Sequence, residues 1–211
     1  MTKIKICGLY RPCDVEYVNR ARPDWCGFII NFPKSHRNVT PEQARELRAG
    51  LSRHIRPVGV FVDRPPEEIA ALLNDGTIAA AQLHGHEDEA YIARLRALAH
   101  GHPMWSGYEI WKAFKVRSAA DLDSANNSTA DMVLLDNGYG TGEIFDWSLA
   151  GSFKKRPFLL AGGLTPENIP DAIAQLHPYG LDISSGVETN KLKDPLKIQA
   201  AVAAVRKEEN L

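Results

Sequence analysis

Eight short apolar runs, each followed by a stretch with helical periodicity, constrain the fold of this chain more than any other feature of its sequence. Several runs are apolar on both faces, as expected for parallel strands covered by helices on one side and packed on the other. They cover residues 4–7, 25–30, 56–62, 79–83, 110–114, 132–136, 158–161 and 181–184. Because eight β/α units close into a barrel, the pattern predicts the α/β class and a single (β/α)8 TIM barrel as one domain over residues 1–211.

The helical stretches begin with residues that commonly cap helices. Thr40 precedes a proline and is followed three residues later by Gln43, the spacing of a capping box. Thr165 also precedes a proline, and Asp194 places an acidic cap before the last helical stretch. An open doubly wound sheet is the main alternative, but no GxGxxG follows the first strand. The recurring strand-to-helix boundaries therefore favour the barrel.

Composition limits the partners and the compartment. The net charge is −1 and the basic residues are scattered, so we expect no nucleic-acid partner. Cys7, Cys13 and Cys26 have the spacing of neither a zinc site nor a disulfide framework, which favours a reducing cytoplasm. The first residues lack a signal-peptide pattern, and no apolar stretch approaches the ~20 residues that span a bilayer. We expect a cytoplasmic protein without a membrane partner, either a monomer or a homodimer.

Cys7 and Asp136 end the first and sixth predicted strands, and barrel active sites lie at the carboxyl ends of the strands. A thiol can act as a general base if donors or positive charge pull its pKa below about 8.5. A small buried hydrophobic role is the alternative for Cys7. Burial raises the pKa of a carboxyl and suits it to general-acid chemistry, whereas a turn cap is the alternative for Asp136, since Asn137 and a glycine follow.

Two glycine- and serine-containing segments follow the seventh and eighth predicted strands. Gly162 and Gly163 form the first, and Ser184, Ser185 and Gly186 form the second. Barrels frequently bind phosphate between these two loops, where glycine lets backbone N–H groups approach the anion. One such pair is usually only a turn, but two in consecutive units predict a phosphate-binding site.

Three further polar residues are candidates for contact with a substrate. Arg37 follows the second predicted strand and can bind a carboxylate in a bidentate manner, although a solvent-exposed loop arginine is the alternative. His84 directly follows the fourth predicted strand and could orient the substrate or simply form a hydrogen bond across the barrel mouth, and Asp182, in the eighth, is a further candidate for substrate contact. His84, His86, Glu87 and Asp88 form a cluster that suggests a metal site. However, the carboxylates of this cluster are expected to begin a helix. We expect no metal.

Seven segments occur in an order that resembles a known family. The chain carries KICGL at 5–9, GVFV at 59–62, QLHG at 82–85, LLD at 134–136, GTG at 140–142 with FDW at 145–147, LAGGL at 160–164 and DISSGVE at 182–188. Together they closely resemble the phosphoribosylanthranilate isomerases of tryptophan biosynthesis, over essentially the whole chain. Two departures are Tyr139, where the family usually has glycine, and Asn38, where it usually has tyrosine.

The resemblance implies an Amadori rearrangement of N-(5-phosphoribosyl)anthranilate, a sugar-phosphate substrate, without metal or cofactor. It implies that Asp136 is the general acid that opens the ribose ring and that Cys7 is the general base that removes the C2 proton. The arginine at position 37 would hold the anthranilate carboxylate, and the loops after the seventh and eighth strands would hold the phosphate.

Other barrel functions remain as alternatives. Indole-glycerol-phosphate synthase would need a lysine acid and a glutamate base, and the isomerase of histidine biosynthesis would place aspartate where Cys7 stands. A non-catalytic sugar-phosphate-binding barrel would keep the glycine loops but lose the acid or the base, and this chain keeps both.

Overall fold

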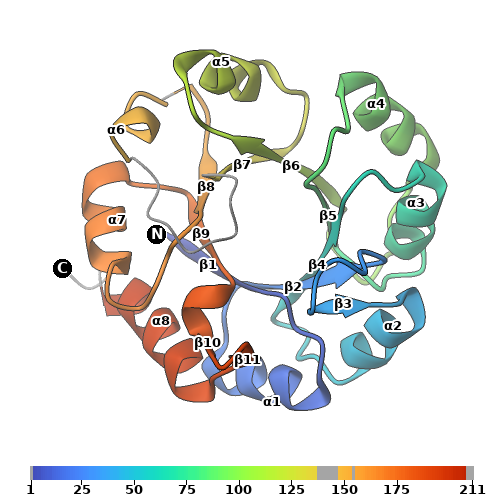
Figure 1. The fold of residues 1–211 in the computed structure, drawn as a ribbon. Coiled ribbons are helices and arrows are strands. Elements are labelled where there is room, and N and C mark those ends of the chain that lie inside the picture. The colour runs from blue at the N-terminus through green and yellow to red at the C-terminus, as the bar shows by residue number, and fades with distance from the viewer. Residues whose placement is uncertain (1, 137–146, 154, 208–211) are drawn as a thin grey trace.

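The structure is a computed structural model that describes residues 2–136, 147–153 and 155–207, with the side chain of Ser148 left out. Its parallel strands close into a barrel, and the helices form a ring around it (Figure 1). The barrel strands are β1 Lys3–Cys7, β2 Trp25–Ile30, β4 Arg56–Phe61, β5 Ala80–Leu83, β6 Glu109–Lys115, β7 Met132–Asp136, β8 Phe158–Ala161 and β9 Gly180–Ile183. The predicted (β/α)8 barrel is confirmed.

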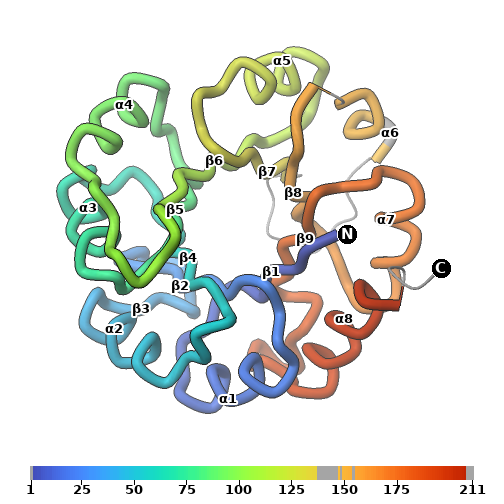
Figure 2. The backbone as a smooth tube through the Cα atoms, turned by 180° about the vertical axis from the view of Figure 1, so that it is seen from behind, coloured from blue at the N-terminus to red at the C-terminus, as the bar shows by residue number. Residues whose placement is uncertain are grey.

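The barrel closes where the first strand meets both the second and the last. β1 pairs in parallel with β2, placing Lys5 opposite Trp25, and with β9, placing Lys3 opposite Gly180. Seen from behind in Figure 2, β1 lies between these two strands. Each barrel strand therefore has a hydrogen-bonded neighbour on both sides, and the carboxyl ends of the strands meet at one mouth.

The outer ring follows the predicted alternation. Its helices are α1 Pro12–Ala21, α2 Pro41–Ala49, α3 Pro66–Asn74, α4 Glu89–Leu98, α5 Ala119–Asn127, α6 Trp147–Ala150, α7 Ile169–Leu176 and α8 Pro195–Lys207. Short elements absent from the sequence prediction are β3 Asn38–Val39, the 3-10 helix η1 Ser185–Val187, and the antiparallel pair β10 Glu188–Thr189 and β11 Leu192–Lys193. In the described part of the chain, no helix has both the length and the apolar character needed to cross a membrane.

The capping residues act as predicted at two of the three helix starts. Thr40 accepts a hydrogen bond from the backbone N–H of Gln43, whose side chain accepts one from the Thr40 N–H. Asp194 accepts from the first-turn N–H groups of α8. The helix expected directly after Thr165 begins only at Ile169, because Asn168 closes a turn first: its Oδ1 accepts from the Thr165 N–H and its Nδ2 donates to the Gly163 carbonyl.

The core has two layers. The larger layer lies between the strands and the surrounding helices. A smaller cluster of inward-facing residues fills part of the barrel interior, namely Trp25, Val58, Ala80, Trp111, Met132, Leu134 and Leu159. The rings of Trp25 and Trp111 meet edge to face, with centroids 5.2 Å apart. Because the interior is packed with side chains, a ligand has room only at a mouth of the barrel.

Candidate active site

A cavity of about 310 Å³ opens where the barrel strands end. It is lined by Cys7, Ile29, Phe32, Ser35, Val60, Val62, Gln82, His84, Asp136, Ala161, Gly162, Gly163, Leu164, Asp182, Ser184 and Ser185. These residues come from β1, β2, β4, β5, β7, β8 and β9 or from the loops directly after them. The cavity therefore lies at the carboxyl ends of the strands, the side that carries the active site in barrels of this kind.

Eight of the ten residues predicted for the site line this cavity. They are Cys7, His84, Asp136, Gly162, Gly163, Asp182, Ser184 and Ser185. Arg37 and Gly186 lie beside the cavity, each against one of its loops. The loop 137–146, with Tyr139 and the glycine-rich segment, lies outside the described residues.

Cys7 contacts a buried ammonium group. Nζ of Lys5 lies 3.3 Å from Sγ of Cys7, 2.5 Å from Oε1 of Gln82 and 2.9 Å from Oδ2 of Asp182. Gly27 of β2 makes room for this arrangement, since a Cβ atom there would lie 2.7 Å from Sγ of Cys7 and 2.9 Å from Cε of Lys5. The sequence analysis missed Lys5 and Gln82. Lys5 and Cys7 are two residues apart on β1, so their side chains must face the same side of the strand.

Burial of Cys7 opposes the thiolate form that a general base requires. The general-base argument from the sequence required a lowered pKa, but burial raises the pKa of the Cys7 thiol above its ordinary value. The charge of Lys5 acts in the opposite direction and offsets part of this effect. Burial has the larger effect because removing an ion from water favours its neutral form.

A line of hydrogen bonds runs from the ammonium group toward Asp136. Lysine has only donors, so the Gln82 oxygen must face Lys5 and the Gln82 NH₂ group must face His84 Nδ1, at 3.3 Å. Nδ1 of His84 then accepts, which leaves the ring proton on Nε2. That nitrogen lies 3.5 Å from Oδ2 of Asp136. The imidazole therefore presents a ring N–H to the carboxyl group of Asp136.

The two predicted phosphate loops lie side by side. A Cβ atom on Gly186 would lie 1.9 Å from the carbonyl oxygen of Leu164, so only glycine permits this approach. Gly162 and Gly163 have φ values of 87° and 66°, a backbone region that side chains disfavour. Ser184 Oγ donates to the carbonyl oxygen of Cys7 at 3.2 Å, which ties the loop after β9 to the end of β1.

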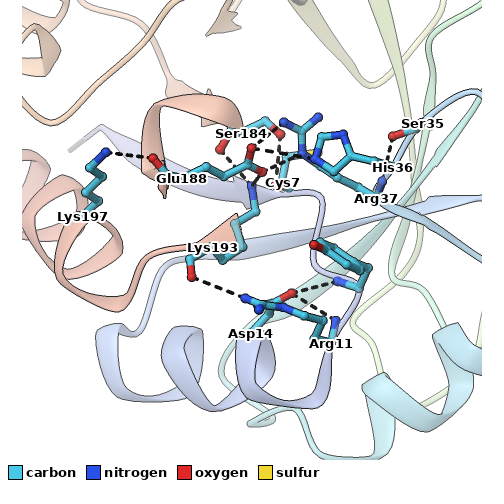
Figure 3. A network of polar contacts seen from close by, with 11 residues as sticks. Cys7, Arg11, Asp14, Ser35, His36, Arg37, Ser184, Glu188, Lys193 and Lys197 are labelled. Carbon is cyan, nitrogen blue, oxygen red and sulfur yellow. Dashed lines mark hydrogen bonds and ion pairs between the residues drawn. The ribbon is translucent and has the colours of Figure 1, made fainter. Parts of the chain in front are cut away.

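Arg37 reaches across the mouth and pairs with Glu188, as Figure 3 shows. Its Nε and Nη2 donate to the two carboxylate oxygens at 2.6 and 2.7 Å. Lys193 donates to the same carboxylate at 2.8 Å. Burial by itself raises the pKa of Glu188, but the hydrogen bond from Arg37 and the charge of Lys193 outweigh it and hold the pKa below its ordinary value. The sequence missed Glu188 and Lys193, although Glu188 ends the DISSGVE segment.

Asp182 has one carboxylate oxygen to offer to a ligand. Oδ2 pairs with Lys5, whereas Oδ1 is buried and makes no hydrogen bond with the described residues. A buried oxygen without a partner is costly, so a donor such as a sugar hydroxyl would stabilise it.

The acidic segment after His84 has structural contacts. Asp63 accepts from the backbone and ring nitrogens of His86, and Glu87 pairs with Lys112. Asp88 caps α4, as the sequence predicted for these carboxylates. Among the described residues, no group of three or more His, Cys, Asp or Glu side chains is placed to hold a metal ion.

Known proteins resemble this chain over nearly its full length. The family model for N-(5'-phosphoribosyl)anthranilate (PRA) isomerase matches residues 4–204. The N-(5'-phosphoribosyl)anthranilate isomerase of Acetivibrio thermocellus is 40% identical over 213 residues, which cover 98% of this chain and 96% of the relative. The crystal structure of the phosphoribosyl anthranilate isomerase of Thermotoga maritima matches with a TM-score of 0.86 and 32% identity, covering 98% of this chain and 100% of that one.

A further solved structure is a phosphoribosyl anthranilate isomerase in complex with reduced 1-(o-carboxyphenylamino)-1-deoxyribulose 5-phosphate. It matches with a TM-score of 0.84 and 31% identity, covering 98% of this chain and 100% of that one. Fold, cavity and sequence similarity agree: this chain belongs to the N-(5'-phosphoribosyl)anthranilate isomerase family.

Proposed function

We propose that this chain catalyses the Amadori rearrangement of N-(5-phosphoribosyl)anthranilate to 1-(2-carboxyphenylamino)-1-deoxyribulose 5-phosphate, in tryptophan biosynthesis. The observation that carries the proposal is that Cys7 and Asp136, a thiol and a carboxyl group from different strands, line one cavity together with the two glycine loops. The family match over residues 4–204 supports the same substrate.

Asp136 acts first, as the general acid. Its carboxyl proton passes to the ribose ring oxygen while the bond from that oxygen to C1 breaks. The lone pair of the anthranilate nitrogen forms a C=N bond to C1, which gives a Schiff base with an open sugar chain. The N–H that His84 presents to Oδ2 of Asp136 can stabilise the carboxylate left behind.

Cys7 acts second, as the general base. Its thiolate takes the proton from C2, the electrons of the C–H bond form a C1=C2 bond, and the nitrogen regains its lone pair. The resulting enolamine becomes the product when the C2 hydroxyl loses its proton and C1 gains one. The Schiff base makes the C2 proton acidic because the positive nitrogen accepts the electrons, so each group performs one proton transfer.

The remaining cavity residues hold the substrate. The backbone of Gly162 and Gly163 and the segment Ser184, Ser185 and Gly186 would bind the phosphate. Nη1 of Arg37, which the Glu188 pair does not use, would reach the anthranilate carboxylate. The apolar side chains of the cavity, such as Phe32 and Val60, would pack against the aromatic ring.

The test is turnover of phosphoribosylanthranilate by the purified chain, followed as loss of anthranilate-type fluorescence, with no added metal and with a chelator present. We expect full activity under these conditions, and growth of a tryptophan auxotroph that lacks this step once the chain is expressed. A correctly folded protein that neither turns over the substrate nor supports growth would contradict the proposal. A requirement for added metal would contradict the metal-free mechanism.

The partner and the location belong to the same proposal. We propose a sugar-phosphate substrate as the partner, no nucleic acid, and a cytoplasmic location for the enzyme. The homodimer, one of the two expected assembly states, is supported by the dimeric phosphoribosylanthranilate isomerase of Thermotoga maritima. That residues 1–211 form one domain stays a prediction.

A further inference from the structure

Lys5 is a charged side chain in a place where charge is costly. It is fully buried, at 0% exposure, and projects into the barrel below the cavity. An ammonium group is retained at such a depth only when it is paired and fully hydrogen-bonded. Its partners must therefore account for its presence.

The three protons of the ammonium group have three acceptors, from three different strands. They are Sγ of Cys7 on β1, Oε1 of Gln82 on β5 and Oδ2 of Asp182 on β9. Burial by itself lowers the pKa of Lys5, but the charges of Asp182 and Cys7 and their hydrogen bonds raise it above its ordinary value. The group therefore remains an ammonium ion.

Cys7 and Asp182 compete for this positive charge. With the thiol protonated, Lys5 and Asp182 balance each other. When Cys7 loses its proton, Lys5, Asp182 and Cys7 together carry a net charge of about −1. The negative charge of Asp182 therefore opposes ionisation of the thiol. The ammonium group acts in the other direction, because an opposite charge at 3.3 Å favours the thiolate.

We propose that Lys5 is a positioning residue that makes the thiolate of Cys7 accessible for its role as base, with Asp182 as the opposing charge that limits how much thiolate forms. The mechanistic meaning of this inference rests on the proposed function, but its physical content is the ionisation of Cys7, which needs no substrate.

Other groups also face Cys7. Lys193 from β11 favours the thiolate, Arg37 from the loop after β2 interacts with its charge, and Cys26 lies on the neighbouring strand β2. Lys5 is distinguished from these groups by its direct hydrogen bond to Sγ.

The experiment measures the alkylation rate of Cys7 by iodoacetamide against pH in the full-length chain. Mass spectrometry of the Cys7 peptide separates this rate from those of the other two cysteines. We expect Lys5→Met to move the midpoint of the rate profile up by at least about one pH unit, since a nearby opposite charge typically shifts a pKa by 1–3 units. Alkylation below the midpoint then slows about tenfold or more. Asp182→Asn should move the midpoint down, because Lys5 is left with Cys7 as its only acidic contact.

The opposite signs separate this role from simple structural damage. Loosening the cavity would hydrate Cys7 in both variants and lower both midpoints toward that of a free thiol. Lys112→Met is the matched control: this lysine is also buried and paired, but with Glu87 and the Gly85 carbonyl, and should leave the Cys7 midpoint unchanged.

An unchanged or lowered midpoint in Lys5→Met would overturn the proposal. If Lys5→Met does not fold, Lys5→Gln takes its place with the same expected rise, and an unchanged or raised midpoint in Asp182→Asn would also overturn the proposal. Because alkylation needs no substrate, a chain that fails to isomerise phosphoribosylanthranilate would contradict the proposed function and leave this measurement intact. In an active chain, the pH profile of kcat/KM should follow the alkylation midpoint of each variant.

Discussion

Arg37 and Glu188, 151 residues apart in the chain, form a two-point ion pair that joins the loop after β2 to the segment after β9. Arg37 passes over Gly8, where a Cβ atom would lie 2.4 Å from its Cδ. The side chains of Arg37 and Glu188 are 17% and 6% exposed, so both are largely withdrawn from water. An arginine held in this way is already oriented before a carboxylate arrives, which reduces the entropy cost of binding.

Glu188→Gln should raise KM for phosphoribosylanthranilate by about tenfold or more, because a hydrogen bond to a charged group contributes about 1.5–3 kcal/mol. The reacting groups are untouched, so we expect a smaller effect on kcat. The free energy of unfolding should also fall, since Lys193 loses its counter-charge. Steady-state kinetics and urea unfolding measure the two effects.

The exposed pair of Arg45 with Asp75 is the control for this prediction. Arg45→Gln should change the free energy of unfolding by less than about 1 kcal/mol, as is usual for surface pairs, and should leave KM unchanged. A Glu188→Gln variant with wild-type KM would show that the orientation of Arg37 by Glu188 does not contribute to substrate binding.

Cys7→Ala and Asp136→Asn should each lower kcat by about 10²-fold or more, the usual contribution of a general acid or base. Both side chains line the cavity, and both substitutions preserve or reduce side-chain volume. Cys13→Ala, on α1 and outside the cavity lining, is the matched control and should retain full activity. Single-turnover kinetics with each variant provide the measurement. A rate near that of the wild type would exclude the substituted residue from the mechanism.

Gly186→Ala should separate the two loops that are proposed to bind phosphate, because the added methyl group meets the Leu164 carbonyl oxygen at 1.9 Å. Overpacking of this kind costs about 1–3 kcal/mol of stability, and inorganic phosphate should inhibit the variant more weakly. Gly50→Ala is the control: its Cβ would have no neighbour closer than 3.7 Å, and its backbone is helical. Equal phosphate inhibition in Gly186→Ala and the wild type would argue against phosphate binding between these loops.

Cys26 should make the protein less stable as the pH rises above about 8.5, the usual pKa of an unfolded thiol. Burial raises its pKa far above that value in the folded chain. Between the two pKa values the unfolded chain has released a proton that the folded chain keeps, so the contribution is complete below pH ~8.5 and is lost as the pH rises. Its slope is about 1.4 kcal/mol per pH unit.

Urea unfolding between pH 8 and pH 10 tests this prediction. Removal of the buried thiol in Cys26→Ala also lowers the free energy of unfolding by an amount that does not depend on pH. The variant and the wild type are therefore compared by the slope of the free energy of unfolding against pH. We expect a shallower loss of stability with pH in the variant. Parallel slopes for Cys26→Ala and the wild type would show that Cys26 does not titrate between the two states.

The sequence by itself determined the barrel and most of the residues at its mouth. Strand periodicity and helix caps are local properties, so all eight barrel strands were predicted to within one residue at each end. Once a barrel is assumed, a strand's last residue and the residue after it must lie near the mouth, which is why Cys7, Asp136 and His84 could be placed there. The short strand β3 was missed because its two residues pair only with the end of β2.

Only the tertiary structure decided what surrounds Cys7. Lys5 contacts Gln82 and Asp182, which are 77 and 177 residues away in the sequence. Contacts between residues so far apart cannot be predicted from local sequence patterns. The pKa of the Cys7 thiol also depends on the balance between its burial and the nearby charges, and burial has the larger effect here. Secondary structure follows from neighbours in the chain, whereas electrostatics follows from neighbours in space.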